Sequence, residues 1–215
     1  MSPYLPFIFP SLSLYHPFLS HSLPFSFIIK ISFISLQLEI EKTDNMKITL
    51  DMLLQSREER WNMQRQLINE NADKTLICLT VIMPGNEKRN EQSLIVARAA
   101  LVALKDAFSG HCFQLTERDL STGFEAFMLT DISLLEAKRM TCAIEDSHPL
   151  GRLFDIDIID KNVSPVSRAA IGAAPRRCLL CNNEARFCMR NHTHTQEELH
   201  NRINEMISDY GKRTV

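Results

Sequence analysis

The stretch that decides the fold runs from Gly151 to Asp160 and reads GRLFDIDIID. Apolar and acidic side chains alternate along it, which predicts a strand from Arg152 to Asp160. Alternate side chains of a strand share a face, so Asp155 and Asp157 should project together, about 7 Å apart along the chain. Ile156 and Ile158 should face the core. The stretch therefore predicts a half-buried strand with two carboxylates on its open face.

These two carboxylates suit a metal site. Mg²⁺ takes carboxylate oxygens together with substrate phosphates and water, and a metal held there could clamp a phosphoryl group during in-line displacement. A glycine at the entrance of the strand lets a phosphate approach the backbone closely, so Gly151 and the adjacent Arg152 are predicted to bind substrate. The pattern G-x-x-x-D-x-D resembles that of the nucleotidyltransferase superfamily, although D-x-D pairs also arise by chance on solvent-facing strands. We predict that Asp155 and Asp157 are catalytic and bind Mg²⁺.

Helical and strand patterns alternate through the rest of the sequence. Ser56 and Glu59 have the spacing of a capping box, which predicts that the first helix starts near Ser56. Apolar periodicity and turn residues predict helices at 56–71, 93–108, 133–147 and 196–210, a strand at 75–83, and a hairpin of 112–118 with 124–129. We expect a single α+β domain with a mixed, nucleotidyltransferase-like sheet, a Cys- and Arg-rich segment and a closing helix.

Residues 1–45 differ in composition from the rest of the chain. They hold five of the nine prolines, six of the twelve phenylalanines and eight serines, but no glycine or arginine. The first basic residue is Lys30, and prolines interrupt the apolar runs, unlike a secretory signal or a membrane span. We expect either that translation starts at Met46 or that these residues are a disordered extension. Residues 46–215 should form the folded domain.

The formal net charge of −2 argues against a generally basic protein that binds nucleic acid or membrane surfaces. Between residues 161 and 194, however, six basic residues accompany one acidic residue. Arginine forks bind phosphates in a bidentate manner, so this cluster predicts phosphate binding; a solvated surface is the alternative. The arginines expected to bind substrate are Arg168, Arg176, Arg177 and Arg190.

The six cysteines fall into two groups. Cys78, Cys112 and Cys142 lie among apolar neighbours and are expected to be buried thiols in a reducing cytoplasm. Three others lie close together and, with one histidine, could form a structural Cys₃His zinc site of Cys178, Cys181, Cys188 and His194. A tight turn that packs small side chains without a metal is the alternative. A redox role for the CxxC pair is less consistent with the sequence, because no strand leads directly into it.

A longer set of motifs runs through the chain. In its last third these motifs are GRLFDIDIID at 151–160, Ser167-Arg168, PRRCLLC at 175–181, Ala185, Cys188-Met189-Arg190, His194 and Glu197-Glu198-Leu199. The first predicted helix adds Leu53-Leu54, Arg57-Glu58, Arg60-Trp61 and Gln64. Together they resemble the apo-citrate lyase phosphoribosyl-dephospho-CoA transferases, and the resemblance covers about residues 46–210.

The resemblance implies a transferase that uses 2'-(5''-triphosphoribosyl)-3'-dephospho-CoA. Such an enzyme joins the phosphoribosyl phosphate to a serine of the citrate lyase acyl carrier protein and releases pyrophosphate. In this reaction a hydroxyl attacks an α-phosphate, and Mg²⁺ with an arginine cluster would stabilise the charge on the phosphates. Because the hydroxyl can attack directly, Cys178 and His194 are expected to be structural rather than nucleophilic. Two alternatives stay open: a non-catalytic zinc-binding interaction module of the citrate lyase assembly system, and a structural subunit of the lyase complex.

Overall fold

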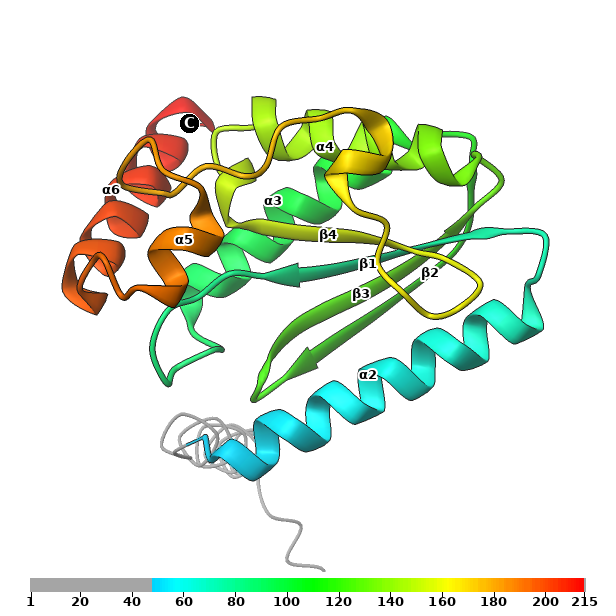
Figure 1. Cartoon of the computed structure of the whole chain (residues 1–215), viewed down its shortest axis with the longest axis horizontal. Helices are drawn as coiled ribbons and strands as arrows, with labels where there is room; N and C mark the ends of the chain where they lie inside the picture. Colours follow the sequence, from blue (N-terminus) through cyan, green and yellow to red (C-terminus); the bar gives the residue numbers. More distant parts are fainter. Residues whose placement is uncertain (1–47, 215) are drawn as a thin grey trace, which may run out of the picture. The chain divides into compact units, whose positions relative to one another are not determined.

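Four strands form the sheet at the centre of Figure 1, in the order β2-β3-β1-β4. The computed structural model describes residues 48–214, so the expectations for residues 1–45 lie outside the described residues. The strands are β1 (Thr75–Val81), β2 (Cys112–Leu120), β3 (Gly123–Thr130) and β4 (Phe154–Ile159). The α-helices are α2 (Leu50–Glu70), α3 (Glu91–Ala107), α4 (Leu134–Ser147), α5 (Ala185–Arg190) and α6 (Gln196–Thr214), and two 3₁₀ turns are η1 (Gly151–Leu153) and η2 (Arg168–Ile171). The predicted α+β class and closing helix are confirmed.

The expectation of a mixed sheet is wrong, because every neighbouring pair of strands in the described chain is antiparallel. Helix α3 does return the chain so that β1 and β2 run in the same direction. The second strand of the hairpin, β3, lies between them and pairs with both. The two strands that a crossover helix makes parallel are therefore never neighbours.

The first helix starts earlier than the capping-box pattern predicts. Thr49 is the residue that caps α2, where its Oγ1 accepts a hydrogen bond from the backbone N–H of Met52 at 3.3 Å. Ser56 instead lies inside the helix, and its hydroxyl accepts a hydrogen bond from Thr122 Oγ1 at 2.8 Å. Its side chain thus ties α2 to the β2-β3 hairpin.

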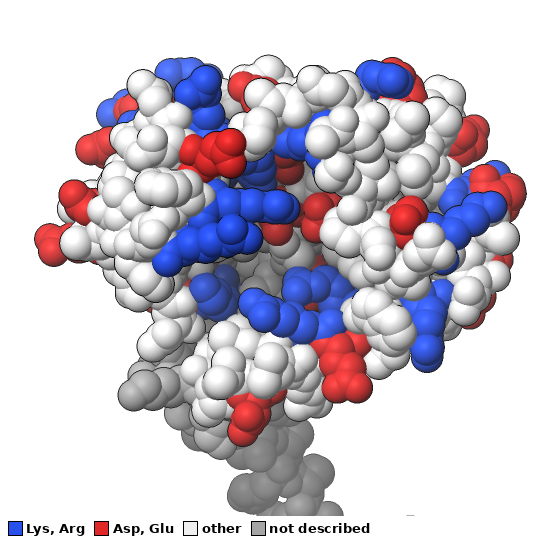
Figure 2. All heavy atoms as spheres, in the orientation of Figure 1, with Lys and Arg blue, Asp and Glu red and all other residues white. Residues whose placement is uncertain are grey.

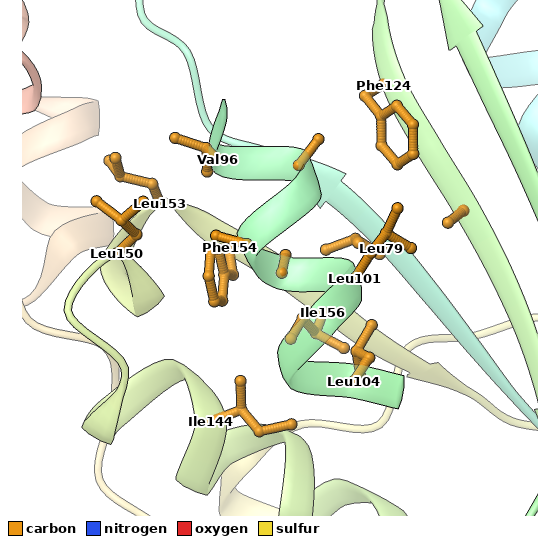
Figure 3. Close-up of a cluster of buried hydrophobic side chains, with 14 of the residues drawn as sticks. Leu79, Val96, Leu101, Leu104, Phe124, Ile144, Leu150, Leu153, Phe154 and Ile156 are labelled. Carbon is orange, nitrogen blue, oxygen red and sulfur yellow. The ribbon is translucent and has the colours of Figure 1, made fainter. Parts of the chain in front are cut away.

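One face of the sheet packs into the main hydrophobic core. Ile77 and Leu79 of β1 and Ile156 and Ile158 of β4 point to this face, where buried side chains of α3, α4 and α6 cover them. Figure 3 shows part of this cluster, with Val96, Leu101 and Leu104 of α3 beside Phe154. Burial of each large aliphatic side chain contributes about 1.5–3 kcal/mol, so this face holds most of the core.

The opposite face is covered by α2 over only part of its area. Leu67 of α2 packs on a smaller apolar cluster with Leu76, Cys78, Phe127, Leu129 and Ile159. The rows of the sheet beyond this cluster carry polar side chains. None of the helices within residues 48–214 combines the length and the apolar character needed to cross a membrane.

Candidate active site

Asp155 and Asp157 lie on the partly covered face of β4, as the alternating pattern predicts. Phe154, Ile156 and Ile158 are buried on the other face. Thr80 is the register partner of Asp155 on β1, and its Oγ1 donates a hydrogen bond to Asp155 Oδ2 at 3.3 Å. The Asp155 side chain is 46% exposed, so its remaining lone pairs are open to a ligand.

A row of polar side chains continues from Asp155 across the whole sheet. Thr80 is opposite Glu125 of β3, which is opposite Arg118 of β2. We call Asp155, Thr80, Glu125 and Arg118 the polar row. Register partners share a face, so these four side chains lie on the same side of the sheet as Asp157.

The electrostatics of the carboxylate pair favour a cation. Burial raises the pKa of Asp157 most strongly, and the negative charge of Asp155 raises it further. Lys138 of α4 and Arg176 oppose these effects. Carboxylate oxygens on one face of a strand are ligands that Mg²⁺ accepts. The residues therefore fit a divalent cation, while magnesium binding itself stays a prediction.

Arg176 is the predicted arginine that the fold brings to the carboxylates. Its Nη1 donates to Asp155 Oδ1 at 3.2 Å. Its Nη2 donates to the carbonyl oxygens of Phe154 at 2.6 Å and Arg152 at 3.3 Å. These three contacts fix the guanidinium against the start of β4 and turn one edge of it toward Asp155.

Glu145 of α4 is a central residue that the sequence reasoning missed. Its side chain is only 4% exposed, and its Oε1 accepts a hydrogen bond from the backbone N–H of Ile156 at 3.0 Å. Ile156 lies between the two aspartates on edge strand β4. Glu145 also pairs with Arg168 at 2.7 Å and with Arg176 at 3.7 Å. No local pattern marks it, because the burial of Lys138 and Glu145, seven residues apart on α4, follows from how α4 packs in the fold.

Arg168, Arg152 and Gly151 lie around Glu145 at the end of α4. Arg168 donates to both carboxylate oxygens of Asp146, at 2.9 and 3.0 Å, in addition to its bond with Glu145. Burial lowers the pKa of Arg152, and the positive charges of Arg176 and Arg168 lower it further. Arg168 is thus engaged with carboxylates, whereas Arg152 lies beside two other arginines.

Gly151 has a packing reason to lack a side chain. A Cβ at this position would lie 2.5 Å from the carbonyl oxygen of Glu145 and 2.7 Å from that of Ile144. Both oxygens belong to α4 backbone, which could move only with the helix. The glycine therefore allows η1 to pack closely on α4, and its role in substrate binding stays a prediction.

Residues 176–190, the arginine segment, carry three further arginines. Arg177 and Arg190 are exposed, and Arg177 Nη1 donates to the carbonyl oxygen of Asn182 at 2.8 Å. Among residues 48–214, no carboxylate forms an ion pair with Arg177, Arg186 or Arg190. Figure 2 shows a hollow on this face of the molecule with Lys and Arg side chains on both of its sides and Asp and Glu within it. Such a surface attracts a polyanion.

The predicted Cys₃His set is also brought together. The ligand atoms of Cys178, Cys181, Cys188 and His194 lie within 4.8 Å of one another. Cys181 Sγ is 3.5 Å from Cys188 Sγ and 3.4 Å from His194 Nε2. A tetrahedral zinc site with usual bond lengths requires about 3.8 Å between two sulfurs and about 3.5 Å between sulfur and nitrogen. The cluster could therefore bind a metal such as zinc.

The backbone around the cluster suits a thiolate. Burial opposes ionisation of the Cys178 thiol, but the N–H groups of Leu180 and Cys181 and the neighbouring thiols bring its pKa down to about 7. The Leu180 N–H lies 3.5 Å from Cys178 Sγ.

Of the cysteines expected to be buried, Cys78 and Cys142 are buried, but that expectation is wrong for Cys112, which is exposed at the start of edge strand β2.

Comparison with known proteins gives consistent matches. Residues 48–210 match the family model described as apo-citrate lyase phosphoribosyl-dephospho-CoA transferase. A protein of Streptococcus pyogenes serotype M18, named probable apo-citrate lyase phosphoribosyl-dephospho-CoA transferase, is 33% identical over 170 residues, which cover 76% of this chain and 87% of that protein. A protein of Vibrio cholerae with the same name is 35% identical over 173 residues, which cover 77% and 95%. Protein CitXG of Haemophilus influenzae is 33% identical over 171 residues, but the match covers only 37% of its length.

Proposed function

Because the chain belongs to the family of apo-citrate lyase phosphoribosyl-dephospho-CoA transferases, we propose that it modifies the citrate lyase acyl carrier protein. The donor is 2'-(5''-triphosphoribosyl)-3'-dephospho-CoA. The oxygen of a carrier serine forms a bond to the α-phosphorus of the donor, the bond from that phosphorus to the pyrophosphate oxygen breaks, and the serine proton is released. The single observation that supports this chemistry best is the pair Asp155 and Asp157 on one strand face with Arg176 against Asp155.

In this proposal Asp155 and Asp157 hold Mg²⁺, which would neutralise charge on the α-phosphate and on the leaving pyrophosphate. Thr80 and Arg176 orient Asp155 by donating to its two oxygens. Glu145 holds the backbone between the two aspartates. The exposed guanidinium groups of Arg177 and Arg190, with Arg152 at the strand entrance, bind donor phosphates. No covalent enzyme intermediate is needed, because the carrier hydroxyl attacks directly.

The test is a transfer assay with purified components. The chain, apo carrier protein, Mg²⁺ and the triphosphoribosyl donor are incubated, and the mass of the carrier and the pyrophosphate released are both measured. We expect the carrier to gain the mass of one phosphoribosyl-dephospho-CoA group per serine, with one pyrophosphate released for each. A carrier that keeps its apo mass, under conditions in which a relative from the same family modifies it, would contradict the proposal.

We also propose that the Cys₃His cluster binds structural zinc. The four ligands are interleaved with the arginines: Arg177 directly precedes Cys178, and Arg186 and Arg190 flank Cys188 on α5. A metal there would link the turn at 178–181, helix α5 and the start of α6. It would thus fix the arginine segment beside β4. Free thiols in this cluster suit a reducing cytoplasm, where we place the protein.

Metal analysis of the purified chain tests this part. We expect about one zinc per chain, since the described residues hold one cluster of four such ligands and structural zinc is four-coordinate. Cys181→Ser should lose the zinc and make the arginine segment sensitive to protease, while Cys112→Ser, a cysteine outside the cluster, should change neither property. A metal-free chain whose arginine segment resists protease would contradict the zinc assignment. Stoichiometric zinc in a chain that transfers nothing would favour the interaction module instead.

A further inference from the structure

A second group of basic residues lies on the other side of the carboxylates from the arginine segment. Arg60 of α2 pairs with Glu125 of the polar row, with 3.2 Å between Nη1 and Oε1. Glu125 is opposite Thr80, which is opposite Asp155. Arg60 therefore reaches the partly covered face at β3, two strands away from β4, which carries Asp155 and Asp157. We call Arg57, Arg60 and Lys88 the second basic wall.

Glu125 anchors this wall. It is 3% exposed, and its Oε2 accepts no hydrogen bond from any residue in 48–214. Burial raises its pKa, while Arg60 and Arg118 oppose that effect. A buried carboxylate of this kind is costly unless cations surround it. Glu125 thus holds Arg60 and Arg118 in place, with 3.8 Å between Arg118 Nη1 and Oε2.

Arg57 and Lys88 carry positive charge that is not neutralised. Arg57 lies one helical turn before Arg60, and neither it nor Lys88 forms an ion pair with a carboxylate in the described part of the chain. Lys88 lies beside the turn of the β2-β3 hairpin, because a Cβ at Gly123 would be 3.7 Å from Lys88 Cβ, and Ser56, the neighbour of Arg57, contacts Thr122 of the same turn. Burial lowers the pKa of Lys88, and the charge of Arg57 lowers it further. Lys88 Nζ donates to the carbonyl oxygen of Met83 at 2.6 Å, which fixes the ammonium group. Two unpaired cations held together favour an anion between them.

We infer that the second basic wall binds the diphosphate of the donor's dephospho-CoA portion, while the arginine segment binds its triphosphate. This inference rests on the proposed donor, which carries two separate polyphosphate groups. The acidic pair lies between two basic groups, so a ligand with anionic groups at both ends would place its reacting phosphate near Asp155. One basic group alone could not hold both polyphosphates on opposite sides of the metal ligands.

The arrangement fits a small anion better than an acidic protein surface. Lys88 and Arg60 are each partly buried, Arg57 is exposed, and Glu125 is almost fully buried. Protein interfaces have an apolar core inside a polar rim, whereas the wall is a small group of cations around a buried carboxylate. A phosphate can reach the partly buried Lys88 and Arg60 as well as Arg57, whereas a folded partner would contact chiefly Arg57. The wall is therefore assigned to the donor and not to the carrier.

The experiment is calorimetric titration of the full chain with dephospho-CoA, which carries the diphosphate but not the triphosphate. Arg57→Gln and Lys88→Gln should each weaken its binding by about tenfold, the size of one charge-assisted phosphate contact. Arg65→Gln is the matched control on the same helix. Its guanidinium lies 4.8 Å from the ring centre of Trp61, and the variant should bind like the wild type. Inorganic triphosphate should bind all these variants with less than about a threefold change.

The outcomes separate this inference from the proposed function. Wild-type affinity for dephospho-CoA in Arg57→Gln and Lys88→Gln, or no binding of dephospho-CoA by the wild type, would overturn the inference. It would also be overturned if these variants raised only the KM for the carrier, because the wall would then be a docking surface. If the variants lose dephospho-CoA affinity while the wild type modifies no carrier, the binding site stands and the proposed transfer fails.

Discussion

The two faces of the sheet are made by the same four strands but differ in what covers them. On one face, buried apolar side chains of α3, α4 and α6 pack on β1, β3 and β4. On the other face, α2 covers one end with Leu67 and crosses the rest as a polar helix. Strand β4 contributes Ile156 and Ile158 to the first face and Asp155 and Asp157 to the second.

This difference shows how one short strand can serve stability and chemistry together. Side chains of a strand alternate strictly, so the second-face positions that lie beyond the contact with Leu67 are not needed for either apolar cluster. These positions carry carboxylates, a hydroxyl and arginines that would be too costly inside the core. The covered face should therefore respond to substitution in stability, and the open face in activity.

Substitution of Glu145 should have the largest effect, because its side chain is buried and also binds the backbone between Asp155 and Asp157. Glu145→Ala removes the acceptor for the Ile156 N–H and leaves Arg168 without one of its partners. Breaking a buried ion pair typically costs about 3–5 kcal/mol. We expect that loss in urea unfolding, together with reduced transfer. Asp146→Ala, an exposed neighbour that also pairs with Arg168, is the control and should cost much less. Equal losses of stability in the two variants would contradict the claim that Glu145 stabilises β4 and Arg168 more than Asp146 does.

A substitution deep in the covered face should change stability alone. Leu104 of α3 is 1% exposed and packs in the main core. Leu104→Ala should lower the free energy of unfolding by about 2–5 kcal/mol, through lost burial and the cavity that remains. The transfer rate per folded molecule should stay near that of the wild type at a temperature well below the melting point. A large loss of transfer rate in Leu104→Ala without a loss of stability would contradict the view that the covered face serves stability alone.

The arginine segment should respond in donor binding. Arg177→Ala should raise the KM for the donor by about tenfold to a hundredfold, since an arginine-phosphate contact is worth about 1.5–3 kcal/mol. Arg139→Ala is a suitable control, because Arg139 is exposed on α4 and its one carboxylate partner among residues 48–214 is Glu136. The donor is varied at fixed carrier, and then the carrier at fixed donor. A change in the carrier KM alone would make the segment a docking patch.

The smallest expected effect is a change in how stability depends on pH, caused by His148 on the covered face. His148 packs against the rings of Phe154 and Tyr210, and its Nδ1 accepts a hydrogen bond from the Leu150 N–H at 3.0 Å. Burial lowers its pKa, so the folded protein favours the neutral ring. The stability from His148 is present above the unfolded pKa of about 6.5 and is lost as pH falls toward the lower folded pKa. His148→Phe should flatten the fall in unfolding free energy between pH 7 and 5. An unchanged slope would show that His148 does not contribute.

Local patterns in the sequence were sufficient for part of the site. Alternation along β4 was enough to place Asp155 and Asp157 on one face, because a strand fixes that geometry within three residues. The Cys₃His ligands span only residues 178–194, so short turns bring them together. Helix existence was also readable, while α5 was missed because six residues give little periodic signal.

Other parts depend on contacts that no local pattern records. Arg60 and Glu125 lie 65 residues apart, and their pairing depends on the path of α2 across β3. The position of β3 between β1 and β2 follows from the hairpin folding back onto β1, which the element order alone leaves open. The contact of Glu145 with the Ile156 N–H depends on how α4 is placed against the edge of β4, and the sequence does not give that placement. Long-range register therefore limited the predictions more than chemistry did.

The most direct test compares two neighbours on β4 that point to opposite faces. Asp157→Asn and Ile158→Val are each measured for single-turnover transfer to the carrier, with urea unfolding on the same samples. Asp157→Asn should lower the transfer rate by about 100- to 1000-fold, the usual cost of removing one electrostatic contact to a transition state, without loss of stability. Ile158→Val should cost about 0.5–1.5 kcal/mol in stability and keep the rate. Wild-type transfer by Asp157→Asn would contradict the assignment of the open face as the active site.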